Sequence, residues 1–211
     1  MPSGAGTSEG SATSAMLDLA FDADGRTLAR DHRHALAAAL QRALPWLAAA
    51  PGAGVHGLKL PPGEEAVAHL SQRTRLMLRL RREHVALAQA LDGVTLELDG
   101  LPLRLHHPRC RELLPLATQY AHLVAFEADD ELAFLGWVDA QLSALGVRAR
   151  IVCGRRQVLE CGTLAGYSLM LDGLAPADAL RLQEQGVGAH RQLGCGVFVP
   201  HKSAAPVGAA P

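Results

Sequence analysis

Apolar residues recur in the first half of the chain with two different periods, and each period predicts a different backbone element. A short apolar run at residues 16–21 indicates a strand, and residues 32–49 carry leucines on one helix face. Asp31 stands where the N-cap of this helix is expected, while Pro45 predicts a kink or an early end. The first half therefore begins with a strand followed by a helix.

Alternation replaces helical spacing further along the first half. A strand edge is expected at residues 55–60, and residues 74–81 alternate so that leucines face one side and arginines largely the other. Residues 83–91 read as a helix, and Gly93 ends it. The Asp99-Gly100 pair between two apolar runs, 94–98 and 101–105, predicts a hairpin.

The second half repeats this order. We expect a strand at 119–126, a helix at 130–145 ended by Gly146, strands at 147–152 and 166–171, a helix at 176–185 and a last strand at 195–199. The order strand, helix, strand, strand, helix, strand occurs twice, which predicts an α+β protein of two tandem ferredoxin-like (RRM-like, βαββαβ) domains. We place these domains at residues 15–110 and 111–202, with a boundary near 108–115, and expect disordered tails at 1–14 and 203–211.

Composition narrows the class of protein. The chain has 211 residues, 49% of them hydrophobic, and no apolar run approaches the length of a membrane helix. Residues 1–14 lack the basic start and apolar centre of a signal peptide. The four cysteines, Cys110, Cys153, Cys161 and Cys195, form no C-x-x-C pair, so we expect reduced thiols, no metal site, a cytoplasmic location and no membrane association.

Arginines are clustered although the net charge is only −1. One cluster comprises Arg73, Arg75, Arg79, Arg81 and Arg82, and a second comprises Arg148, Arg150, Arg155 and Arg156. Arginine grips phosphate through two donors, so these clusters are candidates for a duplex-RNA groove; a solvated strand face is the alternative. Only 4% of the residues are aromatic, which argues against RNA binding by base stacking on an RRM-like sheet.

A glycine-rich segment lies at residues 185–200. It contains Gly186, Gly188, His190, Arg191, Gly194 and Gly196. Successive backbone amides in such a loop can surround an anion, with His and Arg adding donors. The glycines could equally serve only to shape a turn.

The order of residues in this loop resembles the C-terminal glycine-rich loop of the CRISPR repeat-processing endoribonucleases. The segments at 111–121 and 166–171 and the ending Pro200-His201-Lys202 resemble the subfamily first named in a myxobacterial CRISPR system. The resemblance extends over most of residues 16–202. It implies binding to the CRISPR RNA repeat stem-loop, association with the backbone and large subunits of an effector complex, and no cofactor.

Cleavage of RNA without a metal needs a base, an acid and a cation near the phosphate. His56 follows the first predicted helix and Lys59 is close to it, so His56 is our first catalytic candidate and Lys59 the candidate cation. His32 and His34, at the start of that helix, are further catalytic candidates, but two residues of separation prevent them from sharing a face and acting as a pair. In the family that this chain resembles, the catalytic His often lies in this region. Some members carry a catalytic Tyr in the first helix, which this chain lacks, so the proton-transfer partner stays open between Arg42 and Lys59.

The sequence is compatible with three functions. The leading hypothesis is an endoribonuclease that cuts at the 3′ base of a repeat hairpin by attack of the 2′-OH and stays bound to the guide RNA. The second is a non-catalytic subunit that holds the 3′ hairpin of the guide RNA. The third is a pair of ferredoxin-like domains that binds a small metabolite, against which the arginine clusters argue.

Overall fold

The computed structural model describes residues 14–202, so the tails expected at 1–13 and 203–211 lie outside the described residues. Ser14, which we placed in the N-terminal tail, is buried, and its hydroxyl donates a hydrogen bond to the carboxylate of Glu184 at 2.5 Å. The folded part of the chain thus begins at least one residue earlier than expected.

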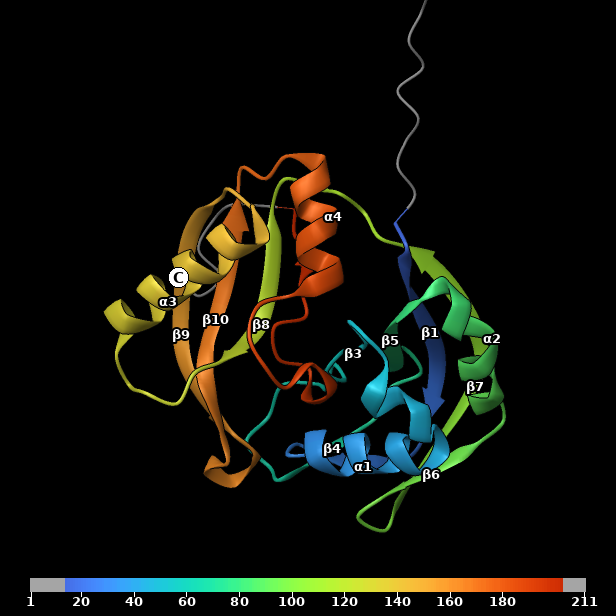
Figure 1. The fold of residues 1–211 in the computed structure, drawn as a ribbon. Helices are drawn as coiled ribbons and strands as arrows, with labels where there is room; N and C mark the ends of the chain where they lie inside the picture. Colours follow the sequence, from blue (N-terminus) through green and yellow to red (C-terminus); the bar gives the residue numbers. More distant parts are fainter. Residues whose placement is uncertain (1–13, 203–211) are drawn as a thin grey trace, which may run out of the picture.

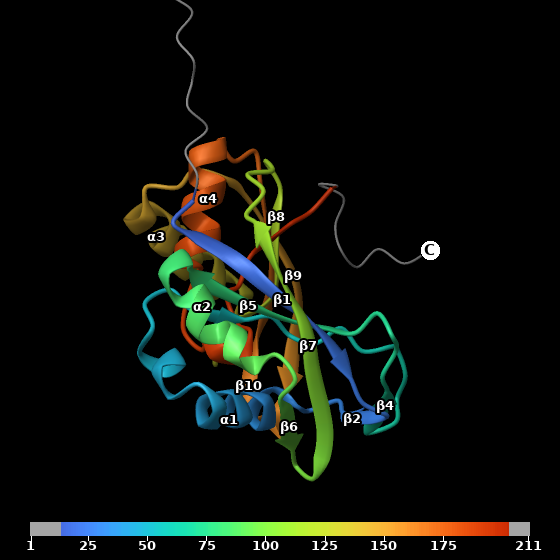
Figure 2. The ribbon, with the colours of Figure 1, turned by 90° about the vertical axis from the view of Figure 1, so that its right-hand side faces the viewer.

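The N-terminal sheet is antiparallel and has the strand order β3-β5-β1-β7-β6. Its first four strands are arranged as a ferredoxin-like fold requires, and β6 adds an edge. A small separate pair, β2 with β4, extends one end of this half (Figure 2). The bounds are β1 (Met16–Asp24), β2 (Thr27–Ala29), α1 (Arg33–Ala43), β3 (Gly54–Val55), β4 (Val67–His69), β5 (Arg75–Arg81), α2 (Val85–Ala88), β6 (Thr95–Leu98) and β7 (Leu101–Glu112).

The C-terminal sheet has the order β11-β8-β10-β9, the arrangement of a ferredoxin-like domain, again with antiparallel neighbours. Its helices α3 and α4 pack against it and against the segment that leads to β11 (Figure 1). The predicted α+β fold of two ferredoxin-like units is confirmed. The bounds are β8 (Gln119–Ala125), α3 (Glu131–Leu145), β9 (Arg150–Leu159), β10 (Leu164–Asp172), α4 (Pro176–Gln185) and β11 (Val199–Pro200).

Several element boundaries differ from the expected ones. α1 ends before Pro45, which opens a separate 3₁₀ turn (Pro45–Ala49), and β3 has two residues instead of six. β7 continues to Glu112, so the proposed domain boundary at 110/111 falls inside a strand. The N-cap of α1 is His32, not Asp31, because the Asp31 carboxylate accepts a hydrogen bond from the backbone of Glu160 instead.

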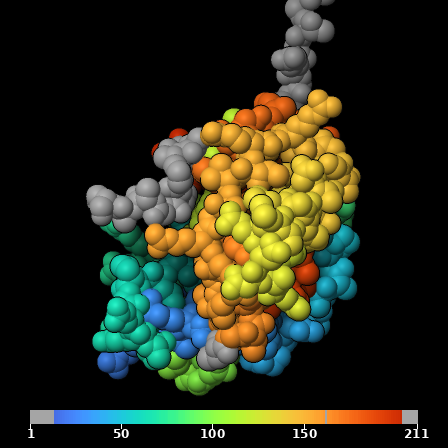
Figure 3. Space-filling view, turned by 90° about the vertical axis from the view of Figure 1, so that its left-hand side faces the viewer, coloured from blue at the N-terminus to red at the C-terminus, as the bar shows by residue number. Residues whose placement is uncertain are grey.

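Each half has its own apolar core. Leu19, Phe21 and Leu40 belong to the N-terminal core, and Phe134, Leu169 and Phe198 to the C-terminal core. In Figure 3, α3 (yellow) lies across the outer face of the C-terminal half, and the N-terminal half (blue and teal) packs directly against the C-terminal half. Among residues 14–202, no helix combines the length and apolarity that a membrane crossing requires.

Candidate functional site

A cleft of about 770 Å³ opens where the segment after β3 meets β5, β8 and the glycine-rich loop. Five cationic side chains and two histidines line it: Arg33, Lys59, Arg73, Arg75, Arg111, His56 and His122. No Asp or Glu of the described residues lines this cleft. Its electrostatic character therefore favours a polyanion, and its two imidazoles can transfer protons at neutral pH.

His56 is buried and held by a carboxylate. Its Nε2 donates a hydrogen bond to Asp18 at 3.0 Å, which leaves Nδ1 as the ring nitrogen that can accept a proton. Burial lowers the pKa of His56, an effect that Asp18 opposes and that Arg79 and Arg191 reinforce. His56 is thus held as a neutral imidazole in one orientation at the wall of the cleft.

The guanidinium of Arg79 holds Asp18, the partner of His56, in place. Its Nε and Nη2 donate to the two oxygens of Asp18 at 2.9 Å each, and its Nη1 donates to the carbonyls of Phe198 at 2.6 Å and Gln183 at 3.1 Å. Although burial raises the pKa of Asp18, the nearby His56 and Arg79 outweigh it and hold that pKa far below the usual range. Arg79 is fully buried, so its expected place on an RNA-facing strand surface is wrong.

His32 and His34 lie at the N-terminus of α1 and do not line the cleft. Nδ1 of the buried His32 donates to the carbonyls of Ala29 and Arg30 at 3.0 and 2.8 Å. The exposed His34 contacts the Thr163 hydroxyl at 3.3 Å. His32 is thus held by the backbone, and neither of these two catalytic candidates is brought to the cleft with His56.

The N-terminus of α1 is capped by a residue from the other half of the chain. The carboxylate of Glu160 accepts hydrogen bonds from the amides of Arg33 at 2.9 Å and His34 at 3.3 Å. The Glu160 amide in turn donates to Asp31 at 3.1 Å. A carboxylate at a helix N-terminus satisfies amides without intrahelical partners and interacts favourably with the helix dipole. This end of α1 is therefore already occupied by an anion of the chain itself.

The two arginine clusters lie in different places. In the first, Arg73 and Arg75 line the cleft, whereas Arg81 is exposed at the other end of β5 and Arg82 pairs with Glu112. In the second, Arg148 is exposed before β9, Arg150 pairs with Asp172 at 2.7 Å, and Arg156 pairs with Asp129 at 3.3 Å. Arg155 is exposed on the same strand. None of the second cluster lines the cleft.

Backbone amides of the glycine-rich loop donate hydrogen bonds to carbonyls of the protein and so do not form an open anion site. The amides of Gly186, Gly194 and Gly196 donate to the carbonyls of Leu182, Arg191 and Leu123. Gly194 alone of the loop glycines lines the cleft, where its missing side chain leaves room for Arg33 and for the backbone of Gly57. The expectation that these amides cradle a phosphate is wrong for the three glycines named here.

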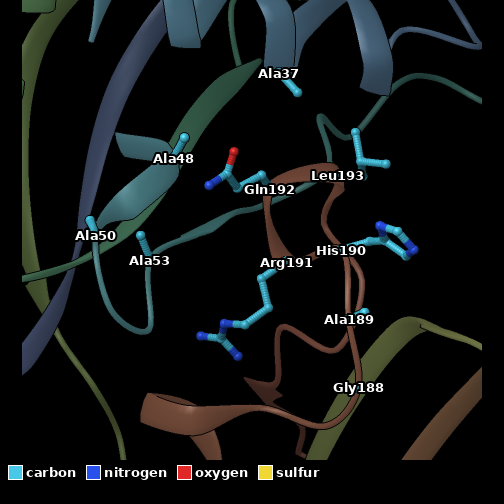
Figure 4. A pocket seen from close by; sticks show the side chains of 10 residues that line it. All are labelled: Ala37, Ala48, Ala50, Ala53, Gly188, Ala189, His190, Arg191, Gln192 and Leu193. Atoms are coloured by element: carbon cyan, nitrogen blue, oxygen red, sulfur yellow. The ribbon is translucent and has the colours of Figure 1, made fainter. Parts of the chain in front are cut away.

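Other loop residues line a second hollow, of about 450 Å³ (Figure 4). Its opposite wall is made of alanines from α1 and the following turn, Ala37, Ala48, Ala50 and Ala53, and its loop side includes Gly188 and His190. Arg191 spans the base of the loop, where it donates to the carbonyls of Gly52 at 3.0 Å and Gly196 at 3.2 Å. Burial, followed by repulsion from Arg79, lowers the pKa of Arg191 to about 10. Its donors hold the two halves together.

Among the side chains that the structure describes, a single group could hold a metal ion: Asp22, His106 and His107. It lies outside the cleft, and Asp22 also pairs with Arg75 at 2.7 Å and Arg109 at 2.6 Å. Two guanidiniums beside the carboxylate oppose the binding of a further cation.

Sequence reasoning missed His122. The one signal available was a polar residue inside the otherwise apolar run of β8, which any surface histidine also produces. Arg33 and Arg111 were likewise missed, because only the packing of the two halves places them beside His56 and Lys59.

Comparison with known proteins places the chain in a family. Residues 17–203 match the family described as "Cas6 Crispr". A curated relative from Myxococcus xanthus, named "CRISPR-associated endonuclease Cas6", is 37% identical over 194 residues, which cover 90% of this chain and 84% of that protein.

Solved structures of low sequence identity share the fold. One described as "CRISPR associated protein Cas6" has a TM-score of 0.63 and 10% identity, covering 89% of this chain and 100% of that one. Another, described as "An RAMP protein binding different RNA substrates", has a TM-score of 0.60 and 13% identity, covering 87% and 98%. Because the family match covers nearly the whole described fold and the curated relative agrees with it, this chain belongs to the Cas6 family.

Proposed function

We propose that this protein is an endoribonuclease that processes CRISPR precursor RNA. The observation that carries the proposal is the cleft between the two halves, which combines Arg33, Lys59 and Arg111 with two histidines and is free of described carboxylates. Family membership supports the same activity, since the Myxococcus xanthus relative is named an endonuclease. The chain would bind the repeat hairpin, cut at its 3′ base and stay bound to the guide RNA beside other effector subunits.

The cleft residues can perform this cleavage without a metal ion. The 2′-oxygen of the RNA attacks the neighbouring phosphorus and loses its proton to Nδ1 of His56. The bond between phosphorus and the 5′-oxygen then breaks, and this oxygen takes up a proton. The products are a 2′,3′-cyclic phosphate and a 5′-OH. Lys59 and Arg33, which line the cleft, stabilise the additional negative charge on the phosphorus oxygens.

Asp18 is a positioning residue for this base. Its carboxylate binds Nε2 of His56, which selects the tautomer and stabilises the imidazolium that forms during attack. The buried Arg79, which donates to both oxygens of Asp18, in turn secures the charge and orientation of that carboxylate.

The test is incubation with RNA of the repeat from the CRISPR array adjacent to the gene, in EDTA. We expect one cut at the 3′ base of the hairpin and a cyclic phosphate on the upstream product. Replacing the 2′-OH at that site with hydrogen should abolish cleavage and preserve binding. Tight binding without cleavage of the natural RNA would instead establish the alternative, a subunit that only holds the guide-RNA hairpin.

A further inference from the structure

The strand β8 contains a bulge at the cleft. Ala121 and Val124 of β8 pair with Leu169 and Tyr167 of β10, so three steps along β8 match two along β10. His122 and Leu123 therefore share the single opposing residue, Ser168. Bulges re-aim side chains and recur beside active sites. At this bulge His122 is exposed, whereas its neighbours Ala121 and Leu123 are buried in apolar cores.

His122 belongs to the C-terminal half, and it lines the cleft together with residues of the N-terminal half. It shares the cleft lining with His56 and Lys59, which come from the segment after β3, and with Arg33 from α1. On its own strand its ring meets that of Tyr120 edge-on, with centroids 4.9 Å apart. No ion pair joins His122 to a carboxylate among residues 14–202, in contrast to the arrangement around His56. We propose that His122 is a catalytic residue of this protein, the general acid that protonates the 5′-oxygen leaving group.

The division of roles between the histidines follows from their surroundings. His56 has only Nδ1 available, and Asp18 stabilises its protonated form, which suits a base. Although His122 is exposed, the cleft walls remove part of its ring from water, and this partial burial is the first cause that lowers its pKa. The nearby Lys59, Arg33 and His56 lower the pKa of His122 further. A lowered pKa makes the imidazolium a stronger acid. A bound phosphodiester brings negative charge beside the ring, which offsets those cations and favours protonation before the bond breaks.

The two histidines together account for both proton transfers of the reaction. The proton lost by the 2′-OH goes to His56, and the proton gained by the 5′-oxygen comes from His122, so the site ends with the two protonation states exchanged. A second step, or exchange with water after product release, restores the starting forms. This inference rests on the proposed function, because the leaving group belongs to the RNA.

A change of leaving group tests the assignment. Sulfur at the 5′-bridging position leaves as a thiolate and needs no proton, so it bypasses a general acid and not a general base. Single-turnover cleavage of the natural repeat RNA and of this phosphorothiolate RNA would be measured for the unmodified chain, His122→Ala, His122→Gln and His56→Ala. His69→Ala, an exposed strand histidine outside the cleft, is the matched control.

We expect both His122 variants to cut natural RNA roughly 10²–10⁴-fold more slowly and to cut the sulfur-containing RNA within about tenfold of the unmodified chain. His56→Ala should be slow on both. With the unmodified chain, the rate on natural RNA should fall as pH rises through the pKa of His122, and this fall should vanish with the sulfur leaving group.

Two results would overturn the assignment alone: His122 variants that cut natural RNA at the parental rate, or a defect that sulfur does not rescue in variants with unchanged melting and RNA affinity. If the unmodified chain cuts neither RNA, the proposed function fails and the assignment fails with it.

Discussion

At the scale of single residues, a place in the cleft lining separates the buried His56 from other buried titratable groups, which bond only to the protein. Arg79 and His32 were candidates for RNA binding and catalysis, yet both are buried and bonded to the protein. Arg79 is tied to a carboxylate, and removing one partner of such a buried pair costs roughly 3–5 kcal/mol. His32 is held neutral against two backbone carbonyls. Residue type identified groups capable of chemistry, and the fold brought only some of them, His56 among them, to the cleft.

The buried His32 should make stability depend on pH. Burial, as the main cause, lowers its pKa from the unperturbed value of 6.5. As pH falls below that value, the unfolded chain binds a proton that the folded protein resists, so the free energy of unfolding decreases. His32→Asn retains a donor for the Ala29 and Arg30 carbonyls and cannot titrate. Urea denaturation at about pH 7.5 and about pH 5.5 should show a smaller loss of stability in the variant. Equal losses would show that His32 does not contribute.

At the scale of elements, hydrogen bonds between the two halves position the segments that line the cleft. The turn between β9 and β10 caps α1 through Glu160, and the Arg33 guanidinium donates to the Leu193 carbonyl at 2.6 Å. Glu160 itself adopts a left-handed backbone conformation, with φ at 52°, in order to face the helix. These elements are thus positioned by each other and not by their local sequences.

The cap provided by Glu160 should be measurable. Glu160→Ala leaves the Arg33 and His34 amides without their carboxylate, and the loss of such a cap costs roughly 0.5–2 kcal/mol. Glu160→Gln keeps an acceptor and should lose less. Both would be compared by urea denaturation. An alanine variant as stable as the parent would show that the contact does not support the junction of the halves.

Gly194 should be intolerant of a side chain because of the cleft wall. A Cβ there would lie 2.7 Å from Nη1 of Arg33 and 3.0 Å from the Val55 carbonyl, at φ 78°. Gly93 has nearly the same φ, 79°, with nothing within 4 Å of a Cβ, so Gly93→Ala isolates the backbone strain. We expect Gly194→Ala to lower stability more than Gly93→Ala and to slow RNA cleavage as well. Equal effects of the two substitutions on stability and cleavage would contradict a steric role.

At the scale of the whole molecule, the halves create a basic cleft that a net charge of −1 does not reveal. Arg33 comes from α1, Arg73 from the segment before β5, and Arg111 from the end of β7, so the charge is gathered by folding. The arginines of β9, although equally clustered along the chain, lie elsewhere and are partly paired with carboxylates. Position in the fold, and not density in the sequence, therefore decides which cluster faces the cleft.

RNA binding should reflect this difference between the clusters. Replacing Arg73 and Arg111 with alanine removes two cleft cations, and each lost phosphate contact should flatten the slope of log affinity against log salt by roughly 0.7–0.9. Replacing Arg148 and Arg150 is the matched control and should leave the slope nearly unchanged. Filter binding of the repeat RNA over a salt series would measure both. A larger effect of the control pair would place the RNA on β9 instead.

Local patterns along the chain are sufficient to predict the α+β class, the repeated order of strands and helices, and the elements with strong start and stop signals. α4 has its predicted bounds because Pro176 and Gly186 flank an amphipathic run, and α3 is capped by Asp130 and ended by Gly146. The spacing of apolar residues and the identity of capping residues are local properties, so the amino-acid sequence alone is enough to predict the elements that depend on them.

The contacts and exposure of the polar residues, in contrast, depend on how the two halves pack. Tertiary packing buried Arg79 beneath Asp18, turned the glycine-loop amides toward protein carbonyls, and brought His122 from β8 to the cleft that His56 also lines. These outcomes depend on contacts between residues far apart in the chain, including a bulge whose register requires both strands. Burial and charge are properties of the assembled surface, and the sequence specifies them only through the packing of the two halves.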